Sequence, residues 1–291
     1  MRSRLQRVAP EWSVELVGIV TEGDRDQTSP LTRIGGKGVF VKALENALLE
    51  ERADIAVHSM KDVPSVLAPN LKISAVLERE DARDALVSQR YTLDSLPVGA
   101  RIGTSSLRRR FQLAHKRPDL EFEELRGNVD TRLGRLRSGD FDAIVLAVAG
   151  LKRLGMEDVI NDYLPIVDSI PAAGQGAIAI EGRDEGPEHP ISILTSQLNP
   201  AETSLCTAAE RQVTASLFAT CDLPVGVHAQ SSTTRDRPGD LTMHAFVADV
   251  SGSQQLRVTA EGGSSRVADD ILHELNSLNV QTLIGSDGSP T

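Results

Sequence analysis

The sequence predicts an α/β protein in which doubly wound sheets are followed by a small α+β domain. Through the first two thirds of the chain, short apolar runs of strand length alternate with helical segments, and this alternation indicates parallel sheets of the doubly wound kind. At 291 residues the chain is long enough for two or three domains, each with its own core. Ligands of such folds bind beyond the carboxyl ends of the strands, so a site is expected in the segments that follow predicted strands.

The expected elements follow the spacing of the apolar residues. Strands are expected at 14–20, 53–58, 73–77, 85–88, 101–103, 122–125 and 143–148, and helices at 38–49, 105–116 and 129–136. The C-terminal third begins with a helix that has Asn199 as its cap, Pro200 in its first turn and Glu202 placed to reach back to the cap. That helix extends to about 218, and strands at 223–229, 243–249 and 255–260 with a helix at 265–278 complete the α+β domain.

The composition argues against several classes of function. Aromatic residues make up only 3% of the chain and its formal charge is −10, so nucleic acid would find few stacking platforms and a repulsive surface. No apolar run approaches the length of a membrane span, and the basic N-terminus lacks the apolar region of a secretory signal. We therefore expect a cytoplasmic protein with neither a membrane nor a nucleic-acid partner, in which Cys206 and Cys221 are free thiols.

The segment from Gly103 to Arg110 is the most informative part of the sequence. A glycine and three hydroxyl residues at a strand-to-helix turn place free backbone N–H groups at the positive end of a helix dipole. Three arginines in the next turn add forked donors suited to carboxylate or phosphate, although a capped surface helix with solvated arginines is the plainer alternative. Between Arg101 and Arg137 lie ten of the 31 Lys and Arg residues against five Asp and Glu, which favours a ligand with several acidic groups.

A second segment, 125–132, repeats this arrangement. A strand ends, Gly127 lets the backbone approach a ligand, and Arg126 and Arg132 lie on either side of the start of the next helix. Because the two turns belong to adjacent units of the fold, we expect them to face one cleft. Arg135 and Arg137, further along, are expected on a solvated helix face.

Two other segments carry groups with chemical potential. Lys61 and Asp62 follow the strand at 53–58 and are either a weak exposed ion pair or, near the arginines, a carboxylate that stays ionised and stabilises a cation or transfers a proton. Cys221 lies in a loop after a helix and is incidental, a nucleophile or a covalent anchor. Cys206 and His58 are expected to pack in the core.

Taken together, these segments resemble the porphobilinogen deaminase family, also called hydroxymethylbilane synthases. The matching stretches, in family order, are 35–38, 56–64, 103–109, 125–132, 146–151, 171–176 and the Cys221 loop. The resemblance implies two periplasmic-binding-protein-like lobes and a third domain, with domain 1 at 1–80 and 177–196, domain 2 at 81–176 and domain 3 at 197–291. It also implies a monomeric transferase that condenses four porphobilinogen molecules head to tail, releases ammonia at each step and frees hydroxymethylbilane with water.

The resemblance further implies a role for individual residues. Asp62 matches the catalytic carboxylate, and Cys221 matches the cysteine that carries a dipyrromethane cofactor through a thioether. No metal is expected. The residues that match cofactor-binding positions are Lys61, Ser106, Arg108 and Arg109, and those that match substrate-binding positions are Arg126, Arg132, Thr104, Lys37 and Gln175.

The chain departs from the family pattern at its start. Family members begin with a strand and an Arg-x-Ser segment, whereas this chain is expected to begin within the first helix, at Met1. Two alternatives to an active enzyme therefore stay open: a truncated, catalytically impaired relative, and a soluble two-lobed binding protein for an acidic small molecule. The matching Cys221 loop favours the enzyme over the binding protein.

Overall fold

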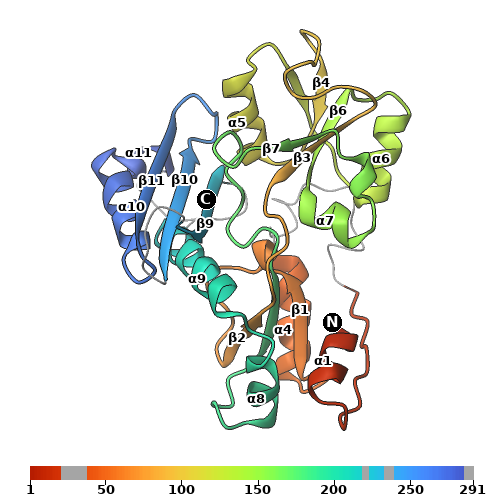
Figure 1. Cartoon of the computed structure of the whole chain (residues 1–291), viewed down its shortest axis with the longest axis vertical. Helices are drawn as coiled ribbons and strands as arrows, with labels where there is room; N and C mark the ends of the chain where they lie inside the picture. The colour runs from red at the N-terminus through yellow and green to blue at the C-terminus, as the bar shows by residue number, and fades with distance from the viewer. Residues whose placement is uncertain (21–37, 218–222, 233–238, 285–291) are drawn as a thin grey trace.

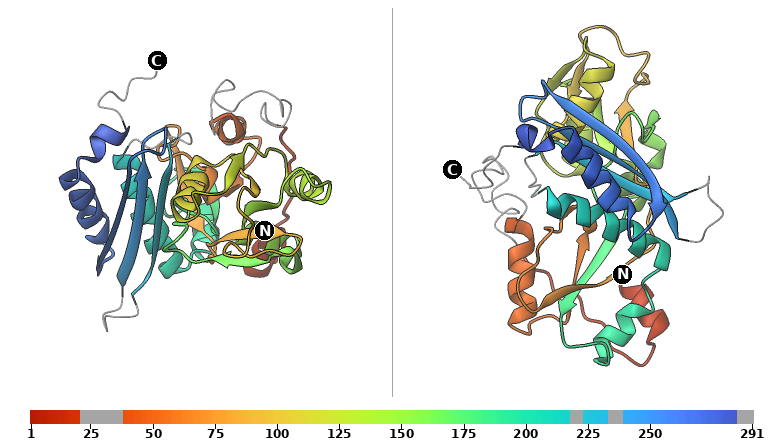
Figure 2. Two further views of the ribbon diagram at one scale, coloured as in Figure 1. Left: turned by 90° about the horizontal axis from the view of Figure 1, so that it is seen from above. Right: turned by 90° about the vertical axis from the view of Figure 1, so that its left-hand side faces the viewer.

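Three β-sheets, each with its own helices, build the protein (Figure 1). The structure is a computed structural model that describes residues 1–20, 38–217, 223–232 and 239–284. A lower lobe and an upper lobe lie one above the other, joined by a narrow neck, and a third unit packs beside the neck and the upper lobe (Figures 1 and 2). The predicted α/β fold with two lobes and a small C-terminal α+β unit is confirmed.

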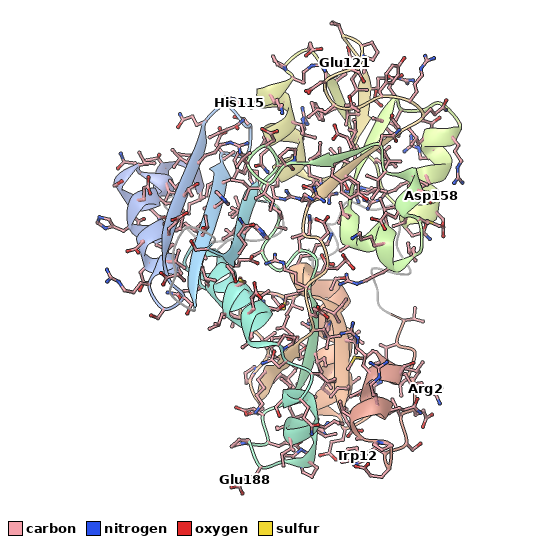
Figure 3. The ribbon with its side chains drawn as sticks, viewed as in Figure 1. Arg2, Trp12, His115, Glu121, Asp158 and Glu188 are labelled. Atoms are coloured by element: carbon pink, nitrogen blue, oxygen red, sulfur yellow. The ribbon has the colours of Figure 1, made fainter. Side chains whose placement is uncertain are left out.

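The lower lobe contains a three-stranded sheet with the order β1-β8-β2. Its central strand, β8 (Ile178–Arg183), runs antiparallel to both β1 (Ile55–Ser59) and β2 (Leu71–Val76). Helix α4 (Gly38–Leu49) covers this sheet, and Leu48 is fully buried against β1 and β2. Two short helices, α1 (Arg2–Val8) and α8 (Pro190–Ser196), pack together at the far end of the lobe, where Figure 3 labels Arg2, Trp12 and Glu188.

The upper lobe contains a five-stranded sheet with the order β5-β4-β6-β3-β7. Strands β5 (Glu121–Glu123), β4 (Arg101–Gly103) and β6 (Ala143–Ala147) are parallel, while β3 (Asp84–Ser88) runs antiparallel to β6 and to β7 (Asp162–Leu164). The sequence analysis expects parallel sheets, and the mixed directions correct it. The physical reason is that β3 and β8 each follow a segment crossing between the lobes and so enter their sheets from the neck. The helices of this lobe are α5 (Leu107–Lys116), α6 (Val129–Arg137) and α7 (Val148–Arg153), with a 3₁₀ turn, η2, at Glu157–Val159.

The third unit has a meander of β9 (Val225–Ser231), β10 (Asp240–Ala248) and β11 (Gln255–Gly263). Helices α9 (Ala201–Ser216), α10 (Val267–Ser277) and α11 (Val280–Ile284) cover one face, where alternate residues of β10 enter the core. The other face carries Phe246, which is fully buried against Phe111 of α5. This contact fixes the third unit against the upper lobe.

Most of the expected elements form within a few residues of their predicted bounds, but one does not. The segment 14–20 is not a strand: it is paired with no strand of the described residues, and Leu16 is 71% exposed. Its apolar alternation predicts a strand, yet a strand needs a partner, and β1 is paired with β8 alone in the described parts of the chain. Five elements were not predicted from the sequence: β7, β8, α7, α8 and α11. No helix of the described residues is long and apolar enough to cross a membrane.

Two chain segments form the neck: the first crossing, residues 77–83, and the second crossing, residues 165–177. Glu210 of α9, fully buried, accepts two hydrogen bonds from Arg79 of the first crossing at 2.6 and 3.2 Å. The same carboxylate accepts the N–H of Gly174, in the second crossing, at 2.6 Å and that of Ala229, in β9, at 2.8 Å. One buried carboxylate therefore ties both crossings to the third unit. His228 lies beside it, with Nδ1 3.5 Å from Glu210 Oε1.

We predict that His228 makes stability depend on pH near neutrality. Burial, followed by the charge of Arg79, holds the pKa of His228 well below its usual value, so the folded protein keeps this imidazole neutral. Below about pH 6.5 the imidazole binds a proton in the unfolded chain but not in the folded chain. The free energy of unfolding therefore falls by up to about 1.4 kcal/mol for each pH unit by which the pH is lowered. The free energy of unfolding, measured with denaturant at several pH values between 7.5 and 5.5, should therefore change less with pH in His228→Gln than in the wild type.

The matched control is His115→Gln, because His115 is exposed on α5 and is labelled at the edge of the molecule in Figure 3. In this variant the free energy of unfolding should change with pH as it does in the wild type. An equal change with pH in the wild type and in His228→Gln would contradict the prediction.

Candidate functional site

Asp84, the first residue of β3, lies at the centre of a cluster of charged and polar side chains. Its carboxylate is fully buried and accepts hydrogen bonds from Arg108 Nη1 at 2.8 Å and from Arg109 Nε at 2.9 Å. Ser169 Oγ and Gln175 Nε2 donate to the same carboxylate at 2.8 and 2.9 Å. One acidic side chain thus gathers groups from the start of α5 and from the second crossing.

The turn before α5 presents both arginines to this carboxylate. Strand β4 ends at Gly103, and Ser106 caps α5 by accepting the N–H of Arg109 at 3.4 Å. Thr104 is buried, and its Oγ1 accepts the N–H of Ser106 at 3.2 Å. The turn lies at the carboxyl end of a parallel strand, the position where doubly wound folds bind ligands.

We call Asp84, Arg108, Arg109 and Arg132 together the arginine cluster. It contains three cationic side chains and one anionic side chain. Burial alone would raise the pKa of Asp84, but the charges of Arg108 and Arg109 outweigh it and hold the pKa well below its usual range. Burial, and then the nearby charge of Arg109, lowers the pKa of Arg132. Two guanidinium groups therefore share a single carboxylate, and a third, that of Arg132, lies near Arg109. Each cation added to such a site favours the binding of an anion.

The Lys61–Asp62 turn lies against the second crossing. The 3₁₀ turn η1 (Met60–Asp62) packs closely on Gly174. A Cβ on this glycine would lie 2.5 Å from Met60 Cγ and 3.2 Å from the backbone nitrogen of Lys61. Gly174 also has a φ of +71°, which favours glycine. The next residue, Gln175, reaches Asp84, so the turn and the arginine cluster are connected through neighbouring residues of one segment.

Cys221 lies outside the described residues, but the chain that follows its loop is placed. Gly226 of β9 packs against Arg108 and the second crossing: a Cβ there would lie 2.6 Å from the Ile170 oxygen and 3.3 Å from Arg108 Cδ. A chain of five residues, from 222 to 226, links Cys221 to this contact, and it spans at most about 18 Å when fully extended. The strand that follows the Cys221 loop therefore begins beside the arginine cluster.

The predicted site residues fall into three groups. Arg108, Arg109 and Gln175 meet at Asp84, and Arg132 lies near Arg109. Arg126 forms an ion pair with Glu124 at 2.6 Å on a partly exposed surface. Lys37, like Cys221, lies outside the described residues. Packing of His58 and Cys206 in the core is confirmed, because both are buried, and burial raises the pKa of the Cys206 thiol to about 11.

The sequence analysis does not identify Asp84. The expected strand at 85–88 begins one residue after it, and the available signal was an acidic residue at the start of an apolar strand. An aspartate in that place is fully buried only if cations surround it, and the cations come from residues more than 20 positions away. Spacing along the chain could not reveal this.

The arrangement fits a ligand with several carboxylates. The excess of guanidinium groups supplies the charge, and the fork of each group matches a carboxylate. Gln175 adds a polar atom without a partner: its Oε1 is buried, and no residue in the described parts of the chain donates a hydrogen bond to it. An N–H group of a ligand would satisfy this acceptor.

We predict that Gly174→Ala disturbs the Lys61–Asp62 turn. The new Cβ would collide with Met60, and alanine would be strained at the positive φ, so the free energy of unfolding should fall by about 2–4 kcal/mol. Gly134→Ala is the matched control, since Gly134 lies in α6 with nothing within 4 Å of its Cβ position, and it should gain up to about 1 kcal/mol. Denaturant unfolding measures both; equal stability of Gly174→Ala and wild type would contradict the close contact.

Comparisons with known proteins agree with this geometry. The profile described as "Porphobilinogen deaminase, dipyromethane cofactor binding domain" matches residues 1–189, and "Porphobilinogen deaminase, C-terminal domain" matches residues 204–275. A porphobilinogen deaminase of Chromobacterium violaceum is 48% identical over 263 residues, which cover 90% of this chain and 83% of that protein. Among solved structures, the periplasmic VFT2 domain of Bordetella pertussis BvgS is 17% identical, with a TM-score of 0.40 over 75% of this chain and 80% of that one. The two profiles and the identity to the curated relative show that the chain belongs to the porphobilinogen deaminase family.

Proposed function

We propose that this protein is a hydroxymethylbilane synthase of tetrapyrrole biosynthesis. It joins four porphobilinogen molecules head to tail, releases one ammonia at each step and uses water to free hydroxymethylbilane. Membership of the porphobilinogen deaminase family supports this transferase activity. The structural observation that carries the proposal is the arginine cluster: Arg108 and Arg109 share the carboxylate of Asp84, and Arg132 lies near Arg109. The second crossing connects this cluster to the Lys61–Asp62 turn through Gly174 and Gln175.

The charge of the substrate explains why such a cluster is needed. Each pyrrole unit brings two carboxylates, so a chain of several units accumulates negative charge that must be held in the protein. Arg132 supplies a partly buried cation that favours binding of one carboxylate, and Arg126, Thr104, Lys37 and Gln175 would complete the contacts to the substrate. Gln175 Oε1 is the acceptor suited to a pyrrole N–H group.

A dipyrromethane cofactor fits the same residues. When bound, the cofactor supplies the primer to which the first substrate unit is joined. Cys221 would hold it through a thioether, and Lys61, Ser106, Arg108 and Arg109 would hold its carboxylates. Family membership supports the cofactor, and the contact of Gly226 with Arg108 supports it further, because this contact lies only five residues after Cys221.

Asp62 would act on the substrate itself. When ammonia leaves porphobilinogen, the substrate becomes an electron-poor cation, and a carboxylate close to its pyrrole N–H stabilises that charge. Gly174 sets the position of this residue, because η1 packs directly on it. Stabilisation of charge, and not proton removal, would be its main role.

Four further properties belong to the proposal: the domain bounds, the location, the oligomeric state and the absence of a nucleic-acid partner. The domains would span 1–80 with 177–196, 81–176, and 197–291, and each of these ranges contains one of the three sheets. The enzyme would act in the cytoplasm as a monomer. Its acidic formal charge of −10 disfavours nucleic acid as a partner.

We predict that intact mass spectrometry of the purified protein shows the chain mass increased by two linked pyrrole units. Cys221→Ser should show the bare chain mass, because serine cannot form the thioether. Cys206→Ser is the control and should keep the adduct, since Cys206 is buried inside α9. A bare mass for the wild type would argue against the enzyme and for a binding protein.

We predict that Asp62→Asn keeps the adduct and loses most of its turnover. If the carboxylate stabilises the substrate cation, replacing it should lower the rate by a factor of about 10² to 10³, because one preorganised group accelerates a reaction by about that factor. Porphobilinogen consumption per adduct-bearing molecule measures the effect. Asp130→Asn, an exposed carboxylate in the first turn of α6, is the control expected to stay active. A rate for Asp62→Asn close to that of the wild type would mean that Asp62 has another role.

A further inference from the structure

We infer that Asp84 is a positioning residue of the reaction: it fixes the guanidinium groups of Arg108 and Arg109, and the amide of Gln175, in the orientation that receives the pyrrole chain. The inference rests on the proposed function, because it concerns how these groups meet their ligand. It names a residue outside the set that the sequence analysis assigns.

The first support is the number of donors that converge on Asp84. Arg108 reaches both carboxylate oxygens, with Nη1 2.8 Å from Oδ2 and Nη2 3.3 Å from Oδ1. Arg109 approaches Oδ1 with Nε at 2.9 Å and Nη2 at 2.8 Å. Gln175 Nε2 donates to Oδ1 as well, at 2.9 Å. Because an ionised carboxylate only accepts hydrogen bonds, it selects the donor edges of all three side chains.

The second support is the set of donors that these contacts leave over. Arg108 Nη1 also donates to the Ile170 oxygen at 2.6 Å, and Arg109 Nη1 donates to the Val145 oxygen at 3.0 Å. A guanidinium has five N–H groups, and the described contacts account for three on each arginine, so two remain on each. Asp84 and two backbone oxygens thereby decide which edges stay available for a carboxylate of the ligand.

The third support is the amide of Gln175. Its Nε2 is held by Asp84 Oδ1 and by the Ala82 oxygen at 2.7 Å, which fixes the amide in one of its two orientations. The opposite atom, Oε1, is the buried acceptor without a partner in the described parts of the chain. Removing the carboxylate charge would let the amide turn over and present a donor where an acceptor now stands.

Glu210 shows what a purely structural carboxylate looks like in the same protein. It is also fully buried and paired with an arginine, Arg79, but its other hydrogen bonds come from the backbone of Gly174 and Ala229. It therefore ties chain segments together. The Asp84 carboxylate, in contrast, accepts hydrogen bonds only from side chains among the described residues, and two of these are cations with unused donors. The pair of carboxylates offers a matched comparison.

The test compares Asp84→Asn and Asp84→Glu with Glu210→Gln. Intact mass first measures the adduct-bearing fraction, and kcat and KM for porphobilinogen are then measured per adduct-bearing molecule, well below the unfolding midpoint of each variant. Asp84→Asn should lower kcat at least about tenfold, because the bound pyrrole chain is no longer aligned, and should leave KM within about threefold. Asp84→Glu keeps a carboxylate in a displaced position, so its kcat should lie between that of Asp84→Asn and that of the wild type. Glu210→Gln should lower the unfolding midpoint and keep kcat within about threefold.

The outcomes separate this inference from the proposed function. A wild type that consumes no porphobilinogen overturns the proposed function, and this inference with it. An active wild type whose Asp84→Asn variant has the same kcat per adduct-bearing molecule overturns the inference alone. Where Asp84→Asn yields no adduct-bearing protein, Asp84→Glu decides: a wild-type kcat overturns the inference, and an intermediate kcat supports it.

Discussion

The balance of charge around Asp84 is the constraint on which the rest of the site depends. Removing a guanidinium from water is costly, and two of them side by side also repel each other. Asp84 makes their burial possible, because its carboxylate lies within hydrogen-bonding distance of both Arg108 and Arg109. A buried ion pair of this kind contributes little net stability. Loss of the carboxylate alone, however, would leave two uncompensated cations and lower the free energy of unfolding by about 3–5 kcal/mol. The site therefore retains an excess of positive charge without losing its packing.

This charge is placed where three parts of the chain meet. Asp84 follows the first crossing, Gln175 belongs to the second crossing, and both arginines open α5. Glu210, on α9 of the third unit, joins the same two crossings to that unit. Two fully buried carboxylates thus hold the crossings: Asp84 binds the arginines and Gln175, and Glu210 binds Arg79 and Gly174. A ligand that binds the arginines is consequently connected, through few contacts, to all three parts of the fold.

Close packing around two glycines brings the chemical groups together. Gly174 allows the Lys61–Asp62 turn to lie directly on the second crossing, and Gly226 allows the strand after the Cys221 loop to lie against Arg108. A side chain at either place would push apart segments that must converge if a carboxylate, a set of guanidinium groups and a thiol are to act on one ligand. The distances that matter for the proposed reaction are therefore set by backbone contacts more than by side-chain length.

The sequence by itself determined the fold class, most of the elements and the positive character of the site. Alternation of strands and helices indicates the α/β class, and the spacing of the arginines after Gly103 and around Gly127 indicates an anion site, because both features are local along the chain. Only the tertiary structure decided that Asp84 is the partner of Arg108 and Arg109, that Gln175 is oriented by it, and that the apolar segment 14–20 finds no strand partner among the described residues. These features depend on pairings between residues far apart in sequence, and the energy of a buried charge or an unpaired strand is set by those neighbours and not by the residue itself.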